Sequence, residues 1–372
     1  MPDLFDQFVT PALQVRPYQK RICTKIHRFT ALEGFKTVMV ESPTGSGKTC
    51  MGLMAARMIQ ETTGLRIGWM CMNRTLLHQA EAENKSKGIN VKCEFFSMFD
   101  KNPPQVDVLF HDEAQHDAAS NAGRIHNEIR PKFIIGLTAT PFRTDHVKLC
   151  FEKVIKDIGI YELIRQGYLS KYDHYTIKDF SIPNVIDLFV KERERWGKSF
   201  IFFLTKEQCY AAQTMIEQYG ITDSEVVHAD TDRERQLNDF REGKLTCLIG
   251  MKTISEGIDA PDLKTVFVRD SAKGPTIQMA GRVFRRHAST PIKQIVQSEQ
   301  TNWTMLKTAM PETQYLHTEG EWRTLQVNPH INRVAMNSLR AIGSSPPVEM
   351  PKILTQAKKV WHAAGRRSNT GS

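Results

Sequence analysis

The sequence predicts an α/β fold built from two successive units, each with a parallel β-sheet flanked by helices. Short apolar runs of strand length alternate with helix-forming segments along most of the chain, and this alternation is typical of strand–helix–strand connections. A glycine-rich segment at residues 42–49 separates one apolar run from a helix-forming segment. An acidic pair, Asp112 and Glu113, ends a later run, at the sheet edge where α/β folds bind their ligands.

The first unit is predicted between residues 14 and 165. Its apolar runs are short enough to be strands that are buried on both faces. The predicted strands cover residues 37–40, 66–70, 106–110 and 133–137. A helix is predicted at residues 50–60, so we expect the first strand, the glycine-rich turn and this helix in direct succession.

The second unit is predicted between residues 170 and 298 by the same alternation. Strands are predicted at residues 199–204, 225–228, 246–250 and 265–269, and helices at 206–219 and 233–242. We expect residues 168–181 to carry the hinge between the units. Residues 185–196 are rich in charges of alternating sign and are expected to form a solvated helix.

The chain beyond residue 298 is expected to be a short extension. Trp303, Tyr315 and Trp322, with Gly320 between the last two, predict a short helix and a hairpin. A further helix is predicted at residues 332–341. From residue 351 onward the chain carries five Lys and Arg residues and no acidic residue. This basic tail either holds phosphates or is a solvated end.

The glycine-rich segment reads Ser-Pro-Thr-Gly-Ser-Gly-Lys-Thr from Ser42 to Thr49. Small residues allow successive backbone N–H groups to turn inward around a polyphosphate, and the following helix adds its positive end. This pattern places Lys48 at the β- and γ-phosphates and the Thr49 hydroxyl on Mg²⁺. Ser42 departs from the strict pattern, and a plain glycine-rich turn is the alternative. The residues expected to hold the phosphates are Thr44, Gly45, Ser46, Gly47, Lys48 and Thr49.

The acidic pair follows an apolar run that we predict to be a buried strand. Asp112 can hold Mg²⁺, and Glu113 can polarise the attacking water; these are separate tasks in phosphoryl transfer. Alone, the pair is also consistent with a solvated turn or a helix N-cap. Downstream of a phosphate-binding loop, a catalytic pair is the better interpretation.

Several segments, in this order, resemble the motifs of superfamily 2 helicases and translocases over about residues 14–290. The segments that carry the resemblance are Arg16-Pro17-Tyr18-Gln19, 42–49, 73–76, Asp112-Glu113-Ala114-Gln115, Thr138-Ala139-Thr140-Pro141, 200–205, 249–261 and 278–285.

The resemblance implies two tandem RecA-like domains at residues 1–165 and 166–298, with a C-terminal extension at 299–372, and it implies ATP and Mg²⁺ as cofactors. It implies that the Gln19 amide reads adenine and that Thr138 and Thr140 couple hydrolysis to strand contact. Arg74 and Thr253 are the implied nucleic-acid contacts. The remaining implied site residues are Arg16, Gly257 and Asp259 at the nucleotide and Gln278 among the catalytic groups.

Arg282 and Arg285 lie about one helical turn apart, so both can point at one γ-phosphate. Arginine is always charged and presents a planar fork of donors. Arginines supplied by a second domain would make hydrolysis depend on closure of the two domains. A basic helix face or ordinary ion pairing is the alternative.

Gln115 and Gln278 differ from the residues at these positions in the RNA-remodelling DEAD-box branch, so the resemblance favours DNA over RNA. It is strongest to the repair, restriction and phage branch of DNA helicases and double-strand translocases, which implies a bacterial or phage-infected cell. The alternatives are an RNA helicase and a slowly hydrolysing ATP-dependent binding switch or clamp. Protein partners are expected through the C-terminal extension.

Composition is consistent with a soluble, cytoplasmic protein. The chain has 372 residues, of which 40% are hydrophobic and 24% charged, enough for two domain cores. Its apolar runs are far shorter than the ~20 residues of a membrane span, and its N-terminus is acidic, unlike a secretory signal. The net charge of +9 favours a polyanionic partner. The seven cysteines lack paired spacing, which argues against a disulfide framework or a zinc cluster.

Overall fold

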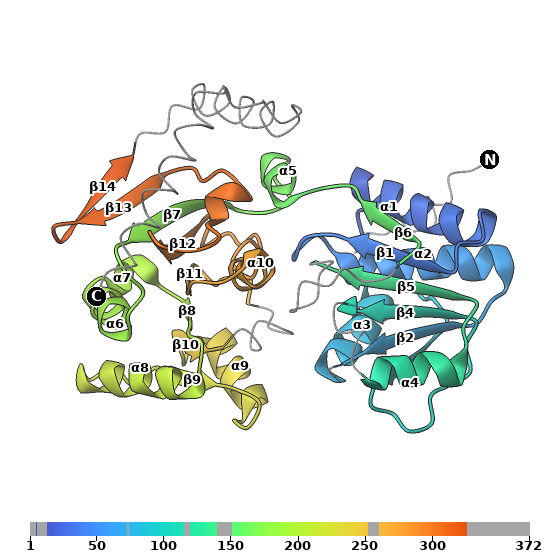
Figure 1. Cartoon of the computed structure of the whole chain (residues 1–372), viewed down its shortest axis with the longest axis horizontal. Coiled ribbons are helices and arrows are strands. Elements are labelled where there is room, and N and C mark those ends of the chain that lie inside the picture. Colours follow the sequence, from blue (N-terminus) through green and yellow to red (C-terminus); the bar gives the residue numbers. More distant parts are fainter. Residues whose placement is uncertain are drawn as a thin grey trace, which may run out of the picture. The chain divides into compact units, whose positions relative to one another are not determined.

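The computed structural model describes residues 5, 13–72, 74–114, 120–139, 151–251 and 260–325 (Figure 1). Two mainly parallel β-sheets, each flanked by helices, confirm the predicted α/β class. Among these described residues, no helix is both long and apolar enough to cross a membrane. The predicted helix at residues 332–341 and the basic tail lie outside the described residues.

The first sheet has six strands in the order β3-β2-β4-β5-β1-β6, and all of their pairings are parallel. Its strands are β1 (Thr37–Glu41), β2 (Ile67–Cys71), β3 (Cys93–Ser97), β4 (Val108–Asp112), β5 (Phe133–Thr138) and β6 (Lys153–Lys156). Its helices are α1 (Pro17–His27), a π-helical turn (Arg28–Leu32), α2 (Lys48–Thr63), α3 (Arg74–Ser86), α4 (Ser120–Ile129) and α5 (Ile160–Arg165). All four strands predicted for the first unit are therefore confirmed.

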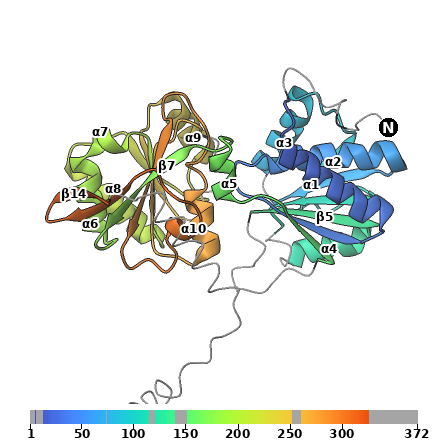
Figure 2. The ribbon, with the colours of Figure 1, turned by 90° about the horizontal axis from the view of Figure 1, so that it is seen from above.

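Helices cover both faces of this sheet (Figure 2). Strand β4 shows how they divide, since successive side chains of a strand point to opposite faces. Val108 and Phe110 pack into the core beneath α1, α2 and α3, whereas Leu109 packs into a separate core with Ile125 of α4. The strand is consequently buried throughout and delivers Asp112 at its carboxyl end.

Helix α2 packs closely on the sheet. A β-carbon at Gly52 would lie 2.7 Å from side-chain atoms of both Leu137 and Trp69, so only glycine allows this approach. The helix begins after Gly47 and ends at Gly64, and both glycines have a left-handed backbone, with φ of +82° and +69°. These glycines set the position of the predicted helix in the sequence.

The second sheet has eight strands in the order β14-β13-β7-β12-β11-β8-β10-β9. Its strands are β7 (Lys171–Ile177), β8 (Ser199–Phe202), β9 (Ser224–Val227), β10 (Cys247–Gly250), β11 (Thr265–Val268), β12 (Ile292–Ser298), β13 (Gln314–Thr318) and β14 (Glu321–Leu325). Its helices are α6 (Ile182–Lys191), α7 (Arg193–Trp196), α8 (Lys206–Gln218), α9 (Arg233–Glu242) and α10 (Lys273–Ala280), with a 3₁₀ turn (Met305–Lys307). The predicted strands and helices of this unit are all present.

The predicted hinge at residues 168–181 is wrong in its extent. Strand β7 fills residues 171–177 and pairs with β12 on one side and β13 on the other, so it is an interior strand of the second sheet. The connection between the two sheets runs from residue 157 to residue 170 and includes α5. We call residues 166–170 the connector.

The helix predicted at residues 185–196 is present as α6 and α7, but the prediction that it is solvated is wrong. Helix α6 buries Val185, Ile186, Leu188 and Phe189, and the short α7 buries Trp196. These residues pack with β8, β10 and β11 in one core. The charged residues between them occupy the other face, which is the arrangement of an amphipathic helix.

The predicted hairpin is confirmed and extends the second sheet. Strands β13 and β14 are antiparallel and turn at Glu319 and Gly320, both with positive φ. Strand β13 pairs with β7, and Tyr315 stacks on Tyr175 with ring centroids 4.5 Å apart. Residues 314–325, expected in a separate extension, therefore lie in this sheet.

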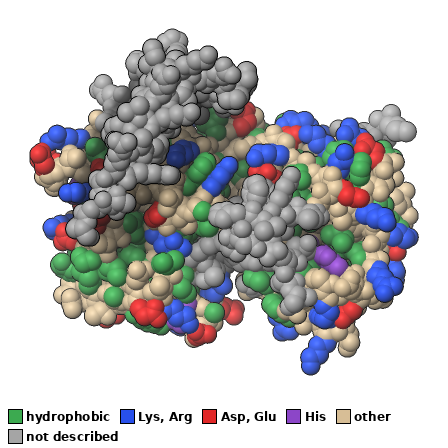
Figure 3. Space-filling view, viewed as in Figure 1, with side chains coloured by type: hydrophobic (Ala, Val, Ile, Leu, Met, Phe, Trp, Pro, Cys, Tyr) green, Lys and Arg blue, Asp and Glu red, His purple; other side chains and the backbone are tan. Residues whose placement is uncertain are grey.

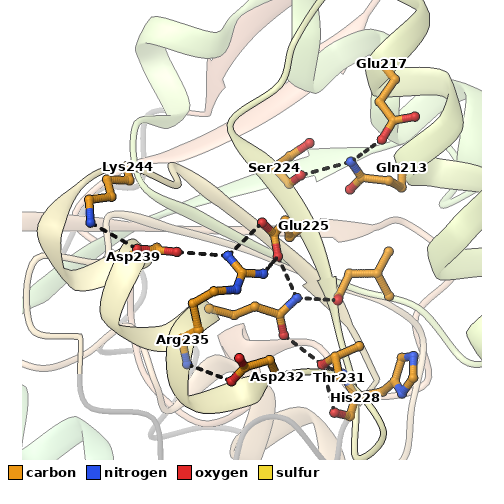
Figure 4. A network of polar contacts seen from close by, with 12 residues as sticks. Gln213, Glu217, Ser224, Glu225, His228, Thr231, Asp232, Arg235, Asp239 and Lys244 are labelled. Carbon is orange, nitrogen blue, oxygen red and sulfur yellow. Dashed lines mark hydrogen bonds and ion pairs between the residues drawn. The ribbon is translucent and has the colours of Figure 1, made fainter.

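Strand β9 is the edge strand at the other end of this sheet and is bound to α9 by side chains (Figure 4). Glu225 accepts hydrogen bonds from Arg235 at 2.6 and 3.2 Å. Gln236 is 4% exposed; its amide donates to Glu225 at 2.7 Å and to the Val226 carbonyl at 2.9 Å, and accepts from Thr231 at 2.7 Å. This network fixes the loop after β9 as well as the strand.

Candidate active site

The phosphate loop lies between β1 and α2, as the sequence predicts. Gly45 and Gly47 have φ of +81° and +82°, a conformation that glycine adopts without strain. The Ser42 hydroxyl donates to the Ser46 hydroxyl at 2.8 Å, which donates to the Pro43 carbonyl at 2.7 Å. Ser42, which departs from the strict pattern, therefore closes the loop internally and is fully buried.

Helix α1 holds the same loop from outside. The Tyr18 hydroxyl donates to the Ser46 carbonyl at 2.6 Å. The Gln19 amide donates to this carbonyl at 3.1 Å, and its oxygen accepts the Arg16 backbone N–H at 2.9 Å. Gln19, expected to read adenine, thus contacts protein groups with both polar atoms.

The acidic pair is placed at the end of β4. Asp112 is 6% exposed, and its carboxylate accepts the backbone N–H of Glu113 at 3.0 Å. Burial raises the pKa of Asp112, and the neighbouring Glu113 carboxylate raises it further, while Lys48 acts in the opposite direction. Glu113 has φ of +54°, which is uncommon for a residue with a side chain and clusters at functional sites.

Charged side chains from both halves of the chain act on the Lys48 ammonium. Burial lowers the pKa of its ammonium, the carboxylates of Glu113 and Asp112 raise it, and the guanidinium groups of Arg282 and Arg285 lower it further. Two carboxylates and three cations therefore act on one another here. Such a group of perturbed charges is typical of active sites.

A cavity of about 1560 Å³ joins these residues. Its lining includes Gln19 and the loop residues Thr44, Gly45, Gly47, Lys48 and Thr49. The cationic side chains among its described lining residues are Arg16, Lys48, Lys87, Arg241, Arg282, Arg285 and Arg286. The acidic ones are Glu83, Asp112, Glu113 and Asp262. Cationic side chains outnumber acidic ones. The cavity is therefore suited to a polyanionic ligand.

The segment after α10 reaches the phosphate loop. A β-carbon at Gly281 would lie 3.2 Å from Cβ of Thr44, so the backbone next to Arg282 passes close to the loop. The connector is bound to the same segment, because the Ser170 N–H donates to the Phe284 carbonyl at 2.8 Å and Arg286 donates to the Gly167 carbonyl at 2.7 Å. The predicted arginine pair is thus brought to the site.

The donors at this site fit Mg²⁺ and a polyphosphate. Asp112 and Thr49 supply the hard oxygen ligands that Mg²⁺ prefers. The pKa of Asp112 is raised by burial and then by the neighbouring Glu113 carboxylate, and a bound cation would act in the opposite direction. The N-terminus of α2 begins at Lys48, where backbone N–H groups remain available to an anion.

Other predicted site residues lie outside the cavity or outside the described residues. Thr138 is fully buried, and its carbonyl accepts the Ser42 N–H at 2.9 Å, which links β5 to the phosphate loop. Gln278 is buried on α10, and Arg74 is the first residue of α3; neither lines the cavity. The predicted residues outside the described residues are Thr140, Thr253, Gly257 and Asp259.

Sequence motifs did not identify every cavity residue. Tyr168 and Leu169 of the connector and Glu83 and Lys87 of α3 also line the cavity. A β-carbon at Gly45 would lie 2.9 Å from the Leu169 side chain, so this connector residue packs directly on the loop. No local pattern marks these positions, since their role depends on tertiary contacts.

Two family models match the chain. The model described as "Type III restriction enzyme, res subunit" matches residues 12–103, which include the phosphate loop. The model described as "Helicase conserved C-terminal domain" matches residues 181–287, which include the arginine pair.

Curated relatives are similar at low identity. The 51.5 kDa protein of Lactococcus phage (isolate 7-9) is 23% identical over 257 residues, covering 60% of this chain and 57% of that protein. UvrABC system protein B of Mycoplasma pneumoniae is 24% identical over 240 residues, covering 61% and 34%. The ATP-dependent RNA helicase eIF4A of Encephalitozoon cuniculi is 31% identical over 97 residues, covering 25% and 23%. The chain thus spans 57% or less of the length of these relatives.

Solved helicase structures share the fold. The structure of S. cerevisiae Dbp5 bound to RNA and ADP BeF3 gives a TM-score of 0.56 at 15% identity, covering 84% of this chain and 95% of that chain. The ATP-dependent Type ISP restriction-modification enzyme LlaBIII bound to DNA gives 0.53 at 14% identity, covering 90% and 30%. These likenesses support two tandem RecA-like domains. With both family models matched and the motifs in their expected order, the chain belongs to the superfamily 2 helicases.

Proposed function

We propose that this chain is an ATP-dependent DNA helicase or double-strand DNA translocase. The observation that carries the proposal is the single cavity lined by Lys48, Asp112 and Glu113 from the first half and by Arg282 and Arg285 from the second. This set contains a phosphate-binding cation, a carboxylate pair and two arginines, which are the groups that phosphoryl transfer requires. The proposed domains are residues 1–165 and 166–298, with an extension at 299–372 whose hairpin at residues 314–325 adds two strands to the second sheet.

Each residue of the set would have a separate task in hydrolysis. The N–H groups at residues 44–49 and the Lys48 ammonium would hold the phosphates. Thr49 and Asp112 would hold Mg²⁺, which supplies charge neutralisation at the β- and γ-phosphates when bound. Glu113 would accept a proton from the attacking water.

The arginine pair would make turnover depend on the second half. Arg282 and Arg285 present forked donors that can follow the charge developing on the transferred phosphoryl group. Gln278 lies on α10, directly before this segment, and would orient it. Hydrolysis would then change how the segment contacts the phosphate loop, and the contact of Thr138 with Ser42 would carry the change into β5.

DNA is proposed as the partner, with Arg74 at the start of α3 and Thr253 as backbone contacts. The family model of a restriction enzyme subunit, the relatives UvrABC system protein B and a phage protein, and the DNA-bound LlaBIII support this choice. The similarity to eIF4A and to RNA-bound Dbp5 favours an RNA helicase as the second candidate. A bacterial or phage-infected cell is the proposed setting.

The test is ATP hydrolysis by the full chain with single-stranded DNA, duplex DNA, forked DNA and RNA of matched length. We expect stimulation by DNA above that by RNA, and a strand-displacement assay separates unwinding from translocation. Lys48→Ala should abolish turnover, because the phosphates lose their point charge. Turnover without any nucleic-acid stimulation would contradict the helicase, and stimulation by RNA alone would favour the second candidate.

A further inference from the structure

Two lysines of the second half lie over the ring of one tryptophan. The Lys273 ammonium is 5.0 Å from the centroid of Trp303, and the Lys307 ammonium is 5.3 Å from it. A cation–π contact holds a cation in place without neutralising it, because the ring carries no net charge. We call these three residues the Trp303 site.

The two ammoniums of the Trp303 site keep their positive charge. Neither lysine forms an ion pair with a carboxylate in the described part of the chain. By contrast, three other exposed lysines of the same half each pair with a carboxylate; they are Lys191, Lys206 and Lys244. Two like charges held at one ring repel each other, and a bound anion would offset this repulsion.

The carboxylate in the loop before Lys273 already has partners. Asp270 accepts the backbone N–H and the side-chain amide of Asn302, both at 2.6 Å, and the Thr301 hydroxyl at 3.2 Å. These bonds join the loop after β11 to the loop after β12. Asp270 therefore holds together the two loops that carry the Trp303 site.

Trp303 is also fixed from below by a buried residue of β12. The amide of Gln297 donates to the Trp303 carbonyl at 3.1 Å and accepts the Met305 N–H at 2.8 Å, and Gln297 is fully buried. The indole N–H donates to the Thr308 hydroxyl at 3.1 Å. The ring and the 3₁₀ turn that carries Lys307 are thus held before any ligand binds, which lowers the entropic cost of binding.

The Trp303 site lies at the carboxyl edge of the second sheet. Strands β8, β10, β11 and β12 run parallel, so the loops that follow them emerge at one edge. The segment after β10, which contains the predicted nucleic-acid contact Thr253, leaves the sheet at this edge too. Helix α10 begins here at Lys273, and Ala272 before it provides no side-chain cap, so the positive end of the helix adds to the site.

The site is separate from the nucleotide cavity, because none of its three residues lines that cavity. Trp303 and Lys307 also lie beyond residues 181–287, which the helicase model matches. Lysine ammoniums are compact point charges that bind phosphates without reading bases. Two of them on a sheet edge suit a chain of phosphates that runs along this edge.

We propose that the Trp303 site binds the phosphate backbone of the nucleic-acid strand on which this chain acts. The inference rests on the proposed function, and it adds a contact to those predicted at Arg74 and Thr253. Through Trp303 and Lys307, the extension takes part in holding the strand.

The experiment measures the affinity of the full chain for fluorescein-labelled oligo(dT) over a salt series. Lys273→Gln and Lys307→Gln should each reduce the logarithmic salt slope by about 0.7, the value for one phosphate contact on a single strand. At 0.1 M salt this slope corresponds to a loss of affinity of about fivefold for each variant and about 25-fold for the double variant. The double variant should also need more oligo(dT) for half-maximal stimulation of ATP hydrolysis, and saturating oligo(dT) should restore the rate.

Three further variants make the result specific. Lys244→Gln removes an exposed lysine that precedes β10, at the opposite edge of the sheet, and it should change neither affinity nor slope. Trp303→Phe keeps an aromatic ring and should retain the affinity. Trp303→Leu leaves both charges but no ring to hold them, so affinity should fall by the same factor at every salt concentration while the slope stays unchanged. Melting curves of each variant report whether it is folded.

The outcomes separate this inference from the function on which it rests. A double lysine variant that binds oligo(dT) like Lys244→Gln would overturn the Trp303 site and leave the helicase intact. Polyglutamate binding as tight as that of oligo(dT), and lost in the double variant, would assign the site to an acidic polypeptide and overturn the nucleic-acid contact. An unmodified chain that neither binds nucleic acid nor is stimulated by it would overturn the proposed function and this inference with it.

Discussion

Lys293 donates a hydrogen bond from its ammonium to the Pro261 carbonyl at 2.7 Å, although its side chain is fully buried. The same ammonium donates to the Leu263 carbonyl at 2.7 Å and to the Thr290 hydroxyl at 2.6 Å. All three of its hydrogens are therefore used. Because Pro261 lines the cavity, this interior strand residue fixes part of the cavity wall.

The first prediction concerns the pH dependence of stability. Burial lowers the pKa of Lys293 to about 8, and the carboxylate of Asp262, which pairs with Lys198, opposes the shift. Lysine in an unfolded chain has a pKa of about 10.4, so between these values the unfolded chain binds more protons at this position. The contribution of Lys293 to the free energy of unfolding should rise with pH across this window, by on the order of 2 kcal/mol.

Urea unfolding from pH 7.5 to 9.5 measures this effect when Lys293→Met is compared with the unmodified chain. The variant should lack the rise, so the difference in stability between the two proteins should change with pH. Lys36→Met, which removes an exposed lysine, is the control and should follow the unmodified chain. A constant difference for Lys293→Met would contradict the prediction.

The second prediction compares two residues of α9 that both contact Glu225. Gln236→Ala should lower the free energy of unfolding by about 1–3 kcal/mol, because it removes three hydrogen bonds that a buried side chain makes to β9 and its loop. Arg235→Ala should lower it by less, since Arg235 is 49% exposed and its ion pairs are screened by water. Urea unfolding midpoints of the two variants show which one loses more stability. A larger loss of stability for Arg235→Ala than for Gln236→Ala would contradict the prediction.

Sequence patterns predicted the local parts of this protein well and its tertiary relationships poorly. Helix α9 was predicted at its observed bounds, because Asp232 caps its start and Gly243 ends it with φ of +81°. Strand β7 was missed, since its place as an interior strand depends on pairing with β12 and β13, which lie far along the chain.

The candidate site also has parts that the sequence predicts and parts that it does not. Lys48, Asp112 and Glu113 belong to local motifs whose strand and turn context the sequence itself contains. The contact of Arg16 with Tyr168 joins residues far apart in the chain, and the packing of Gly281 on Thr44 depends on how two sheets fold. Neither relationship has a local signature, so only the structure could reveal them.

The third prediction concerns Glu113. Glu113→Gln keeps the shape of the side chain but cannot accept a proton, so turnover should fall by about 10²–10⁴-fold. Nucleotide affinity should stay within a few fold, and the variant should remain bound to DNA in the presence of ATP. Glu83→Gln is the matched control, because Glu83 is another carboxylate of the same cavity, and its loss of turnover should be smaller than tenfold. A large loss of nucleotide affinity in Glu113→Gln would argue against a role as base.

The fourth prediction concerns the arginine pair. Arg282→Ala or Arg285→Ala should lower kcat by about 10³-fold or more, with a much smaller change in nucleotide affinity, because the guanidinium stabilises charge that develops during transfer. Arg282→Lys or Arg285→Lys keeps the positive charge but lacks the forked donors of the guanidinium. Each lysine variant should therefore retain more of the rate than the alanine variant, but less than the unmodified chain. Equal losses in kcat and in affinity would indicate ground-state binding instead.

The fifth prediction is that DNA affinity depends on phosphate contacts and falls steeply with salt. Lys and Arg side chains are interspersed with Asp and Glu on the described surface drawn in Figure 3, whereas residues 351–372 contain five Lys and Arg and no acidic residue. Basic residues that touch phosphates release counterions, and each lost contact should reduce the logarithmic salt slope by about 0.9 on duplex DNA. Deleting residues 351–372 should therefore weaken binding and flatten the slope.

Binding titrations over a salt series, on two unrelated DNA sequences and on RNA of matched length, measure both the affinity and its salt slope. Affinity for the two DNA sequences should agree, because phosphate contacts carry no sequence information. A slope that the deletion leaves unchanged would show that the tail makes no phosphate contact. Tighter binding to RNA than to DNA at every salt concentration would contradict the choice of DNA while leaving the nucleotide site untouched, since phosphate and base contacts in the cavity do not depend on which strand is bound.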